Sequence, residues 1–362
     1  MDEEIASIEK NNTWKLVDLP DGKNVIGVKW IYKTKFKEDG SIHKHKARLV
    51  AKVYSQQHGV DAWNSKIDSY FRSNGFERSQ SEPSLYVKKG VQDFLIVCLY
   101  VDDLIYTGTS LAMVQEFKKA MMEEYEMTDL GLMKYFLGIQ VRQSKGEIFI
   151  SQEKYLEEVL KKFHMNNCKP ISTPLAVNEK FQLYDGADKA DSKTYRSIVG
   201  SLIYLTNTRP NIVYPVSLIS RFMHEPSKLH FAVAKRILRY LRTRKFGIKY
   251  VKEKENELVG YTDSDWAGSL DDRKSTSGYV FCLGSKIISW ASKKQKTISL
   301  SSAEVEYIAA TDAACEAVWL RRILSDVQQS QDDPTTILCD NMSAIAMTKN
   351  PVFHARSKHI EL

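Results

Sequence analysis

Hydrophobic residues along this chain recur at two spacings, and the spacing separates predicted strands from predicted helices. A continuous apolar run at residues 94–99 is followed, four residues later, by the apolar stretch 104–106, which predicts two strands joined by a tight turn. Residues 25–32 and 46–52 flank the turn sequence 38–41 and predict a second hairpin. The first part of the chain is therefore expected to be rich in β-structure.

Apolar residues spaced three or four apart predict helices further along. The helical stripes are Val114, Phe117, Met121 and Tyr125, then Tyr155, Leu156, Val159 and Phe163, then Phe231, Ala234, Ile237, Leu238 and Leu241. Strands are expected at residues 135–141 and 147–151. The aperiodic stretch 164–193, with Pro170 and Pro174, is predicted to be an inter-domain linker.

The pattern changes again near residue 257, where strands precede a helix. A first strand ends at Asp263, a hairpin follows within 279–290, a long helix begins near Ser302, and a last strand ends at Asp340. This order is β-β-β-α-β.

Together these elements predict a multidomain fold of the α+β and α/β classes, with mixed sheets and helices. Its parts are a β-rich segment at 1–61, a mixed segment at 62–163, the linker at 164–193, a helical segment at 194–256 and the β-β-β-α-β unit at 257–362.

Composition narrows the class of protein. The 362 residues are 43% hydrophobic, enough for several cores, and the net charge of +7 permits a polyanionic partner. The five cysteines are far apart and mostly within apolar runs, which indicates reduced core residues and no disulfide or metal-ligand spacing. The acidic N-terminus lacks the apolar stretch of a signal peptide, and no apolar run reaches membrane-spanning length. We therefore expect a soluble intracellular protein.

Positive charge gathers in two places. Lys33, Lys35, Lys37, Lys44, Lys46, Arg48 and Lys52 lie on both arms of the N-terminal hairpin, and Lys235, Arg236, Arg239, Arg242, Arg244 and Lys245 lie on and after the helix near residue 235. Either group is compatible with a solvated basic face or with contacts to nucleic-acid phosphates. The sequence alone leaves both interpretations open.

Two adjacent carboxylates, Asp102 and Asp103, lie within strand-forming residues and form the first acidic candidate. Neighbouring carboxylates repel each other, so folding alone does not favour the pair. A divalent cation at the hairpin tip would reverse that cost, whereas the alternative is a solvated Asp-Asp turn.

A second acidic constellation lies in the C-terminal segment. If the strands that end at Asp263 and Asp340 are parallel neighbours, their ends meet at one sheet edge, which the start of the helix carrying Glu306 can also reach. Three carboxylates there could hold Mg²⁺ and support two-metal phosphodiester cleavage. The alternative is that these acids are only caps of their elements.

At this point a family resemblance becomes clear over nearly the whole chain. The motifs that carry it include Asn12-Thr13-Trp14-Lys15-Leu16-Val17, Lys46-Ala47-Arg48-Leu49-Val50-Ala51-Lys52, Tyr100-Val101-Asp102-Asp103, Tyr135-Phe136-Leu137-Gly138-Ile139, Thr208-Arg209-Pro210, Asp263-Ser264-Asp265-Trp266-Ala267-Gly268, Ser292-Lys293-Lys294-Gln295, Glu304-Val305-Glu306-Tyr307, Cys339-Asp340-Asn341 and Lys358-His359-Ile360. In this order they resemble the reverse transcriptase and ribonuclease H region of copia-type LTR retrotransposon Pol polyproteins.

The resemblance implies roles for segments and residues. Residues 1–61 would be fingers, 62–163 the second half of the palm, 194–256 thumb or connection, and 257–362 a ribonuclease H-like domain. Asp102 and Asp103 would be catalytic metal ligands of the palm, and Asp263, Glu306 and Asp340 three of four ribonuclease H carboxylates. Glu304 and Asp265 rank below their neighbours for that role. Residues 135–140 would lie near the primer grip.

The same resemblance implies cofactors and partners. Two-ion sites for Mg²⁺ or Mn²⁺ are expected, with an RNA template, a DNA primer and an RNA–DNA hybrid as partners. Lys35, Lys46 and Arg48 are implied contacts for nucleotide or template, and Arg239 and Arg242 are nucleic-acid candidates on the basic helix. The implied location is the cytoplasm, in a virus-like particle, or the nucleus.

The chain departs from the family pattern between Asp61 and Ala62, where the first half of the palm and its metal-binding aspartate are missing. Asp61 and Asp68 are the nearby acids, and neither has the apolar strand context of that ligand. Loss of two palm strands is also expected to leave unpaired backbone beside the hairpin. Two-metal phosphoryl transfer needs the third carboxylate, so we expect no DNA synthesis.

Two further departures lie elsewhere. The fourth ribonuclease H aspartate of the family belongs beyond Leu362 and is not replaced by Glu361, so nuclease activity is expected to be low or absent. Val53 stands where the family favours glycine.

Three hypotheses follow. The chain is an active polymerase with ribonuclease H, a catalytically inactive remnant that binds nucleic acid, or a pseudogene product with a sound C-terminal domain and a defective palm.

Overall fold

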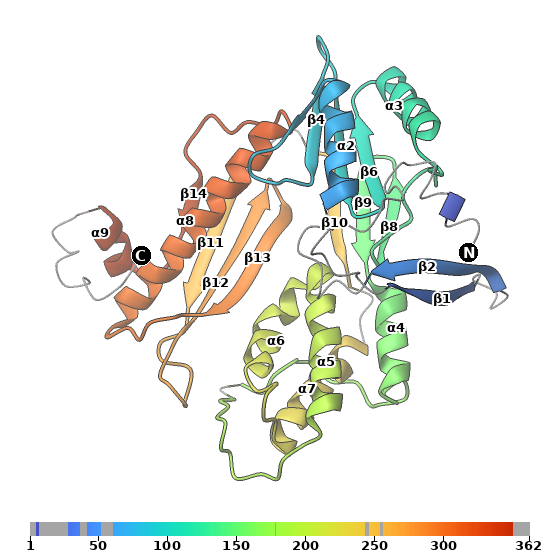
Figure 1. Cartoon of the computed structure of the whole chain (residues 1–362). Helices are drawn as coiled ribbons and strands as arrows, with labels where there is room; N and C mark the ends of the chain where they lie inside the picture. The colour runs from blue at the N-terminus through green and yellow to red at the C-terminus, as the bar shows by residue number, and fades with distance from the viewer. Residues whose placement is uncertain are drawn as a thin grey trace, which may run out of the picture. The chain divides into compact units, whose positions relative to one another are not determined.

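The computed structural model describes residues 5–6, 28–36, 42–51, 61–177, 179–242, 246–253 and 256–349 (Figure 1). The chain divides into two compact units. One comprises Met1–Gly131 with Asp326–Gln328, and the other comprises Leu132–Ser325 with Gln329–Leu362. No helix in the described ranges is long and apolar enough to cross a membrane.

The first unit begins with the predicted basic hairpin. Strands β1 (Val28–Phe36) and β2 (Ile42–Ala51) pair antiparallel, which confirms the hairpin, whereas its turn at 38–41 lies outside the described residues. The register places Lys33 opposite Lys46 and Lys35 opposite Lys44.

A four-stranded antiparallel sheet and two helices form the rest of this unit. Its elements are α2 (Asp61–Ser73), β3 (Phe76–Arg78), β4 (Leu85–Lys89), β5 (Phe94–Tyr100), β6 (Asp103–Gly108) and α3 (Leu111–Glu124), with strand order β3-β4-β5-β6. Alternate residues of β5 are buried, and the Ser110 hydroxyl caps α3 by accepting from the Met113 amide. In the described sheet β6 is an edge strand that pairs with β5 alone.

Aromatic side chains pack α2 against this sheet. Phe71 of α2 is fully buried, and its ring centroid lies 4.7 Å from that of Tyr86 and 5.2 Å from that of Phe76. On the predicted stripe of α3, Phe117, Met121 and the capping residue Tyr125 are buried in the same core. The helix that begins at Asp61 is therefore an integral part of this core.

The second unit contains a sheet of order β10-β9-β8-β7 and a helical bundle. Its elements are β7 (Tyr135–Phe136), β8 (Ile139–Ser144), β9 (Glu147–Ser151), α4 (Glu153–Lys162), α5 (Ser192–Leu205), η2 (Thr206–Thr208), η3 (Pro210–Ile212), α6 (Val213–Ser220), α7 (Lys228–Arg242) and β10 (Ile248–Val251). The bundle core includes fully buried Tyr195, Leu202, Ala234 and Ile237.

Two expectations for this region are wrong in detail. The single strand predicted at 135–141 is two strands, because Leu137 and Gly138 turn the chain with φ of 47° and 79°. Ile248–Val251, within the stretch expected to be helical, is a strand that pairs antiparallel with β9. Four residues are too few for a period to distinguish helix from strand.

The last part of the second unit has the predicted β-β-β-α-β order. Strands β11 (Leu258–Ser264), β12 (Thr276–Leu283), β13 (Lys286–Lys294) and β14 (Thr336–Leu338) form a sheet of order β13-β12-β11-β14, with helices α8 (Ser302–Asp326) and α9 (Met342–Lys349). Helix α8 covers one face of this sheet (Figure 1) and buries Ala313, Ala317 and Leu320 against a core that includes Leu258 and Phe281. Small alanines permit this close approach of helix and sheet.

Candidate active sites

The Asp102–Asp103 pair lies at the tip of the β5–β6 hairpin, as the hydrophobic pattern predicts. Tyr100 pairs with Asp103, so Val101 and Asp102 form a two-residue turn. Both aspartates are exposed. The hairpin therefore presents two carboxylates to solvent.

The turn carries backbone strain, and a neighbouring helix donates a hydrogen bond to it. Val101 has a φ of 54°, a left-handed conformation that is costly for a β-branched residue. The Trp63 indole Nε1–H of α2 donates to the Val101 carbonyl oxygen at 2.7 Å, and the Trp63 ring packs edge-on against Tyr125 at 5.3 Å. Sequence reasoning missed Trp63, because only the fold brings residues 38 positions apart into contact.

No described residue completes a three-carboxylate site at the hairpin. Within the described ranges, only Glu306, Cys339 and Asp340 form a close group of three or more potential metal-ligand side chains. Asp68 is engaged elsewhere, because it accepts from the Tyr86 hydroxyl at 2.9 Å and from Arg72 Nε at 2.8 Å. In the described residues the hairpin therefore presents two carboxylates, and no group of three or more potential ligand side chains includes them.

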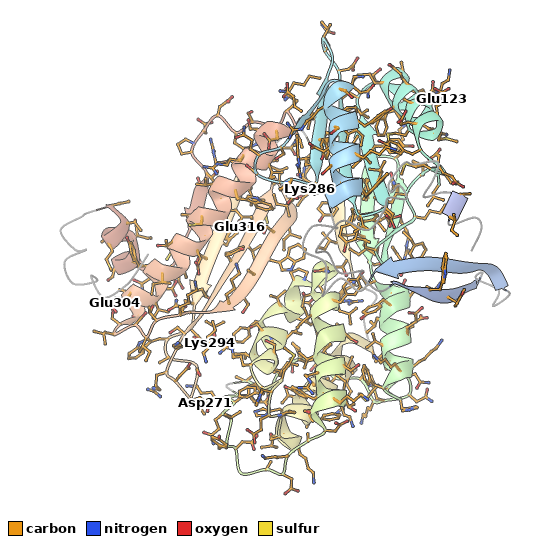
Figure 2. The ribbon with its side chains drawn as sticks, in the orientation of Figure 1. Glu123, Asp271, Lys286, Lys294, Glu304 and Glu316 are labelled. Atoms are coloured by element: carbon orange, nitrogen blue, oxygen red, sulfur yellow. The ribbon has the colours of Figure 1, made fainter. Side chains whose placement is uncertain are left out.

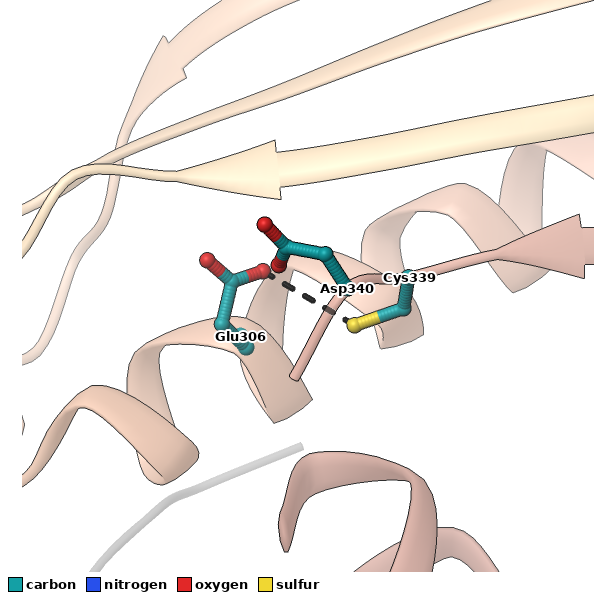
Figure 3. Close-up of side chains that lie close together, drawn as sticks. All are labelled: Glu306, Cys339 and Asp340. Atoms are coloured by element: carbon teal, nitrogen blue, oxygen red, sulfur yellow. Dashed lines mark hydrogen bonds between the residues drawn. The ribbon is translucent and has the colours of Figure 1, made fainter. Parts of the chain in front are cut away.

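The C-terminal carboxylates converge at one edge of a sheet. Strands β11 and β14 are parallel neighbours, which confirms the arrangement on which the sequence argument depended. Glu306 extends from α8, and Cys339 and Asp340 follow β14 directly (Figure 3). Each of these three residues offers one potential metal-ligand atom, and these three atoms lie within 4.8 Å of one another.

Asp263 joins this group through a shared backbone donor. The Ser264 amide N–H donates to Asp263 Oδ1 at 2.8 Å and to Glu306 Oε1 at 3.1 Å. Asp263 is exposed, whereas Glu306 is only 6% exposed. Asp263, Glu306, Cys339 and Asp340 are called the C-terminal acidic site below.

The electrostatics of this site favour a bound cation. Burial raises the pKa of the Glu306 carboxyl, and the charges of Asp263 and Asp340 raise it further, against the lowering effect of the Ser264 amide. Burial likewise raises the pKa of the Cys339 thiol. A divalent ion would offset this repulsion, and the clustered carboxylate oxygens suit Mg²⁺ or Mn²⁺.

Two nearby acids have other roles. Glu304, at the start of α8 (Figure 2), accepts from the Leu300 amide at 2.7 Å, and its own amide donates to the Ser301 hydroxyl at 3.3 Å. Asp265 accepts from the Thr276 amide at 2.7 Å within the loop after β11. In the described residues neither acid belongs to the close group of Glu306, Cys339 and Asp340.

The five cysteines differ from the expected core residues in their exposure. All five are described and carry free thiols, as expected. However, Cys315 is exposed, and Cys339 lies at the C-terminal acidic site with its Sγ 3.9 Å from Glu306 Oε2. The expectation of core residues is wrong for exposed Cys315 and correct only in part for the other four, which are partly buried.

The basic candidates fall into two groups. Lys35 lies on β1, and Lys46 and Arg48 lie on β2; their side chains are outside the described part of the structure. Arg239 Nε donates to the Lys169 carbonyl at 2.8 Å, and Arg242 donates to the Cys168 carbonyl. These two arginines bind the segment before α5 within the chain itself, which gives them a structural role.

Comparison with known proteins shows which family this chain matches. A model of the reverse transcriptase (RNA-dependent DNA polymerase) family matches residues 11–62 and 57–177. The chain is 33% identical over 450 residues to the retrovirus-related Pol polyprotein from transposon TNT 1-94 of Nicotiana tabacum, covering 100% of the chain and 34% of the relative. It is 32% identical over 442 residues to the Pol polyprotein from transposon RE1 of Arabidopsis thaliana, covering 100% and 30%. An uncharacterized mitochondrial protein of the same plant is 41% identical over 226 residues, covering 62% of the chain and 94% of that protein.

These matches bear on the junction at Asp61/Ala62. The chain spans about a third of the length of the two Pol polyproteins. The alignment with the tobacco relative has 450 positions, whereas the chain has 362 residues. At least 88 positions of the alignment therefore have no counterpart in this chain. The two parts of the family match meet at residues 57–62, where the sequence pattern breaks.

Proposed function

Because this chain belongs to the reverse transcriptase family of copia-type retrotransposon Pol polyproteins, we propose that it is a remnant of a reverse transcriptase and ribonuclease H region. In this proposal the chain does not synthesise DNA, and its remaining metal chemistry belongs to the C-terminal acidic site. RNA, DNA and their hybrid are its proposed partners.

The observation that carries this proposal concerns the potential metal ligands that the described residues offer at the Asp102–Asp103 hairpin. Members of this family use divalent metal ions, and phosphoryl transfer requires carboxylates that hold the ions together with the triphosphate. In the described ranges no third ligand side chain accompanies the pair. Two exposed carboxylates on one turn hold an ion weakly, because water and flexible ligands compete with them.

The C-terminal acidic site has the better arrangement for a cation. Glu306 and Asp340 present carboxylate oxygens, and the Ser264 amide orients Asp263 and Glu306. A bound divalent ion would supply Lewis acidity and an activated water for phosphodiester hydrolysis. Asp263 and Asp340 are exposed, so a nucleic-acid strand can reach them.

The test is cleavage of the RNA strand in an RNA–DNA hybrid by the full chain with Mg²⁺ or Mn²⁺. We expect slow, metal-dependent cleavage that falls to background in Glu306→Gln and Asp340→Asn. The double variant Asp102→Asn with Asp103→Asn is the matched control, and its rate should stay within twofold of the unmodified chain. Cleavage that survives Asp340→Asn, or that is lost in the control, contradicts the assignment.

A further inference from the structure

Gln295 is a buried amide that follows β13 and contacts three elements around the C-terminal acidic site. It is 5% exposed. Its Nε2 lies 3.3 Å from Ser264 Oγ on β11, 2.9 Å from Ser277 Oγ on β12 and 3.0 Å from the Val305 carbonyl oxygen on α8. One side chain therefore bridges two strands and the helix.

Two of these contacts adjoin the carboxylates in sequence. Ser264 follows Asp263, and Val305 precedes Glu306. The Ser264 amide also donates to both Asp263 Oδ1 and Glu306 Oε1. Moving Ser264 relative to Val305 would therefore change the separation of the two carboxylates.

The chemistry of a primary amide suits this position. The Ser264 hydroxyl donates to the Thr276 carbonyl at 3.1 Å, which leaves its oxygen free to accept from Gln295. The Val305 carbonyl can only accept. A glutamate would lack the N–H groups that these acceptors need, and a methionine would match the length without hydrogen bonding.

The backbone holds Gln295 in place for this role. Its amide N–H donates to the Ser275 carbonyl at 2.8 Å, extending the β12–β13 pairing by one residue. The Ser299 hydroxyl approaches Oε1 at 3.5 Å. The side chain is thus fixed from both ends before any ligand binds.

We propose that Gln295 is a positioning residue that sets the spacing of Asp263 and Glu306 for a divalent cation. This inference rests on the proposed function of the C-terminal acidic site. Groups that orient metal ligands in this way commonly change metal affinity 10- to 100-fold when they are removed.

The chain offers a matched control in Gln331. This amide also joins distant segments, because its Oε1 accepts from the Leu258 amide at 3.0 Å and its Nε2 donates to the Asn256 carbonyl at 3.1 Å. Leu258 begins the strand that carries Asp263 near its other end. Gln331→Met therefore removes comparable hydrogen bonds from the same sheet without touching the residues beside Asp263 and Glu306.

The experiment measures Mn²⁺ binding to the full chain by electron paramagnetic resonance of the free ion, with circular dichroism to confirm folding. We expect Gln295→Met and Gln295→Glu to weaken Mn²⁺ affinity by about tenfold or more. Gln331→Met should change it less than twofold, even where both methionine variants lower the melting temperature. If Gln295 had only a structural role, Mn²⁺ affinity would fall in proportion to the melting temperature in Gln295→Met, Gln295→Glu and Gln331→Met alike.

Folded Gln295→Met with unchanged Mn²⁺ affinity, or an equal loss in Gln331→Met, overturns the inference. If Gln295→Met does not fold, Ser264→Ala removes the acceptor instead, and unchanged affinity in that variant overturns it equally. If Glu306→Gln leaves Mn²⁺ affinity unchanged, the proposed metal site is wrong and this inference is wrong with it. If Glu306→Gln weakens Mn²⁺ binding but Gln295→Met does not, the site stands and only the role of Gln295 is wrong.

Discussion

At the scale of single residues, the two acidic sites differ in what surrounds each carboxylate. Asp102 and Asp103 are exposed on a turn whose Val101 carbonyl accepts a hydrogen bond from the Trp63 indole. Glu306 is buried, and its carboxylate shares the Ser264 amide with Asp263. An oriented and partly desolvated carboxylate interacts more strongly with a cation than an exposed one.

The acids themselves could be found from the sequence, whereas their supporting residues could not. Asp263 and Asp340 stand at the ends of recognisable strands, and that position alone indicates a shared sheet edge. Gln295 and Cys339 stand within family motifs that do not reveal their contacts, and Trp63 has no motif of its own in the sequence analysis. Their roles come from contacts with residues 10 to 38 positions away, which only the folded chain specifies.

His230 gives a prediction at this scale. It is 1% exposed, stacks on Phe222 at 3.9 Å, and accepts from the Ser227 amide through Nδ1 at 3.1 Å. Burial lowers the pKa of His230, although the charge of Asp185 opposes this. The folded state thus binds a proton less readily than the unfolded chain, so stability is full above about pH 6.5 and declines as pH falls through that value toward the lowered pKa.

We expect urea unfolding to show lower stability at pH 5.5 than at pH 7.5, a difference that His230→Gln largely removes. His224 is a nearby histidine outside this core, and His224→Gln serves as the control that keeps the pH dependence. Equal slopes in the unmodified chain and His230→Gln would count against this account.

At the scale of elements, periodicity predicts the long segments and fails at short ones. Helix α8 and the β12–β13 hairpin fall where the pattern places them. The β7–β8 turn was missed, because the apolar residues continue through Leu137 and only Gly138 indicates a break. Strand β10 was missed because its pairing with β9 depends on a partner about 100 residues away.

The β7–β8 turn makes a testable prediction. Gly138 has a φ of 79°, and a Cβ there would lie 2.8 Å from the Tyr204 hydroxyl. Gly138→Ala is expected to lower stability by about 1–3 kcal/mol through backbone strain and this close contact. Gly146→Ala is the control, because Gly146 has a φ of 80° but no atom within 4 Å of an added Cβ.

Thermal unfolding of both variants measures the difference. Gly146→Ala should lose only the stability that the positive φ costs an alanine, and it should melt at a higher temperature than Gly138→Ala. The reverse order would show that the Tyr204 contact does not limit this turn.

At the scale of the whole molecule, the chain retains the motifs of its family around a missing segment. The family match divides at residues 57–62, and α2 starts at Asp61 and packs into the core of the first unit. This helix, which begins at the junction, covers the β3–β6 sheet through Phe71 and its aromatic neighbours. A packed core needs apolar area whereas catalysis needs particular carboxylates, so the core alone does not decide whether the proposed loss of polymerase activity is correct.

Primer extension on an RNA template is the most direct test of the central claim. The full chain, a reverse transcriptase with an intact palm, and the variant Asp102→Asn with Asp103→Asn are compared with Mg²⁺ and with Mn²⁺. We predict no incorporation by the chain above the double variant under either ion. Template-dependent incorporation that disappears in the double variant would contradict the account, because it would show that the hairpin forms a complete polymerase site.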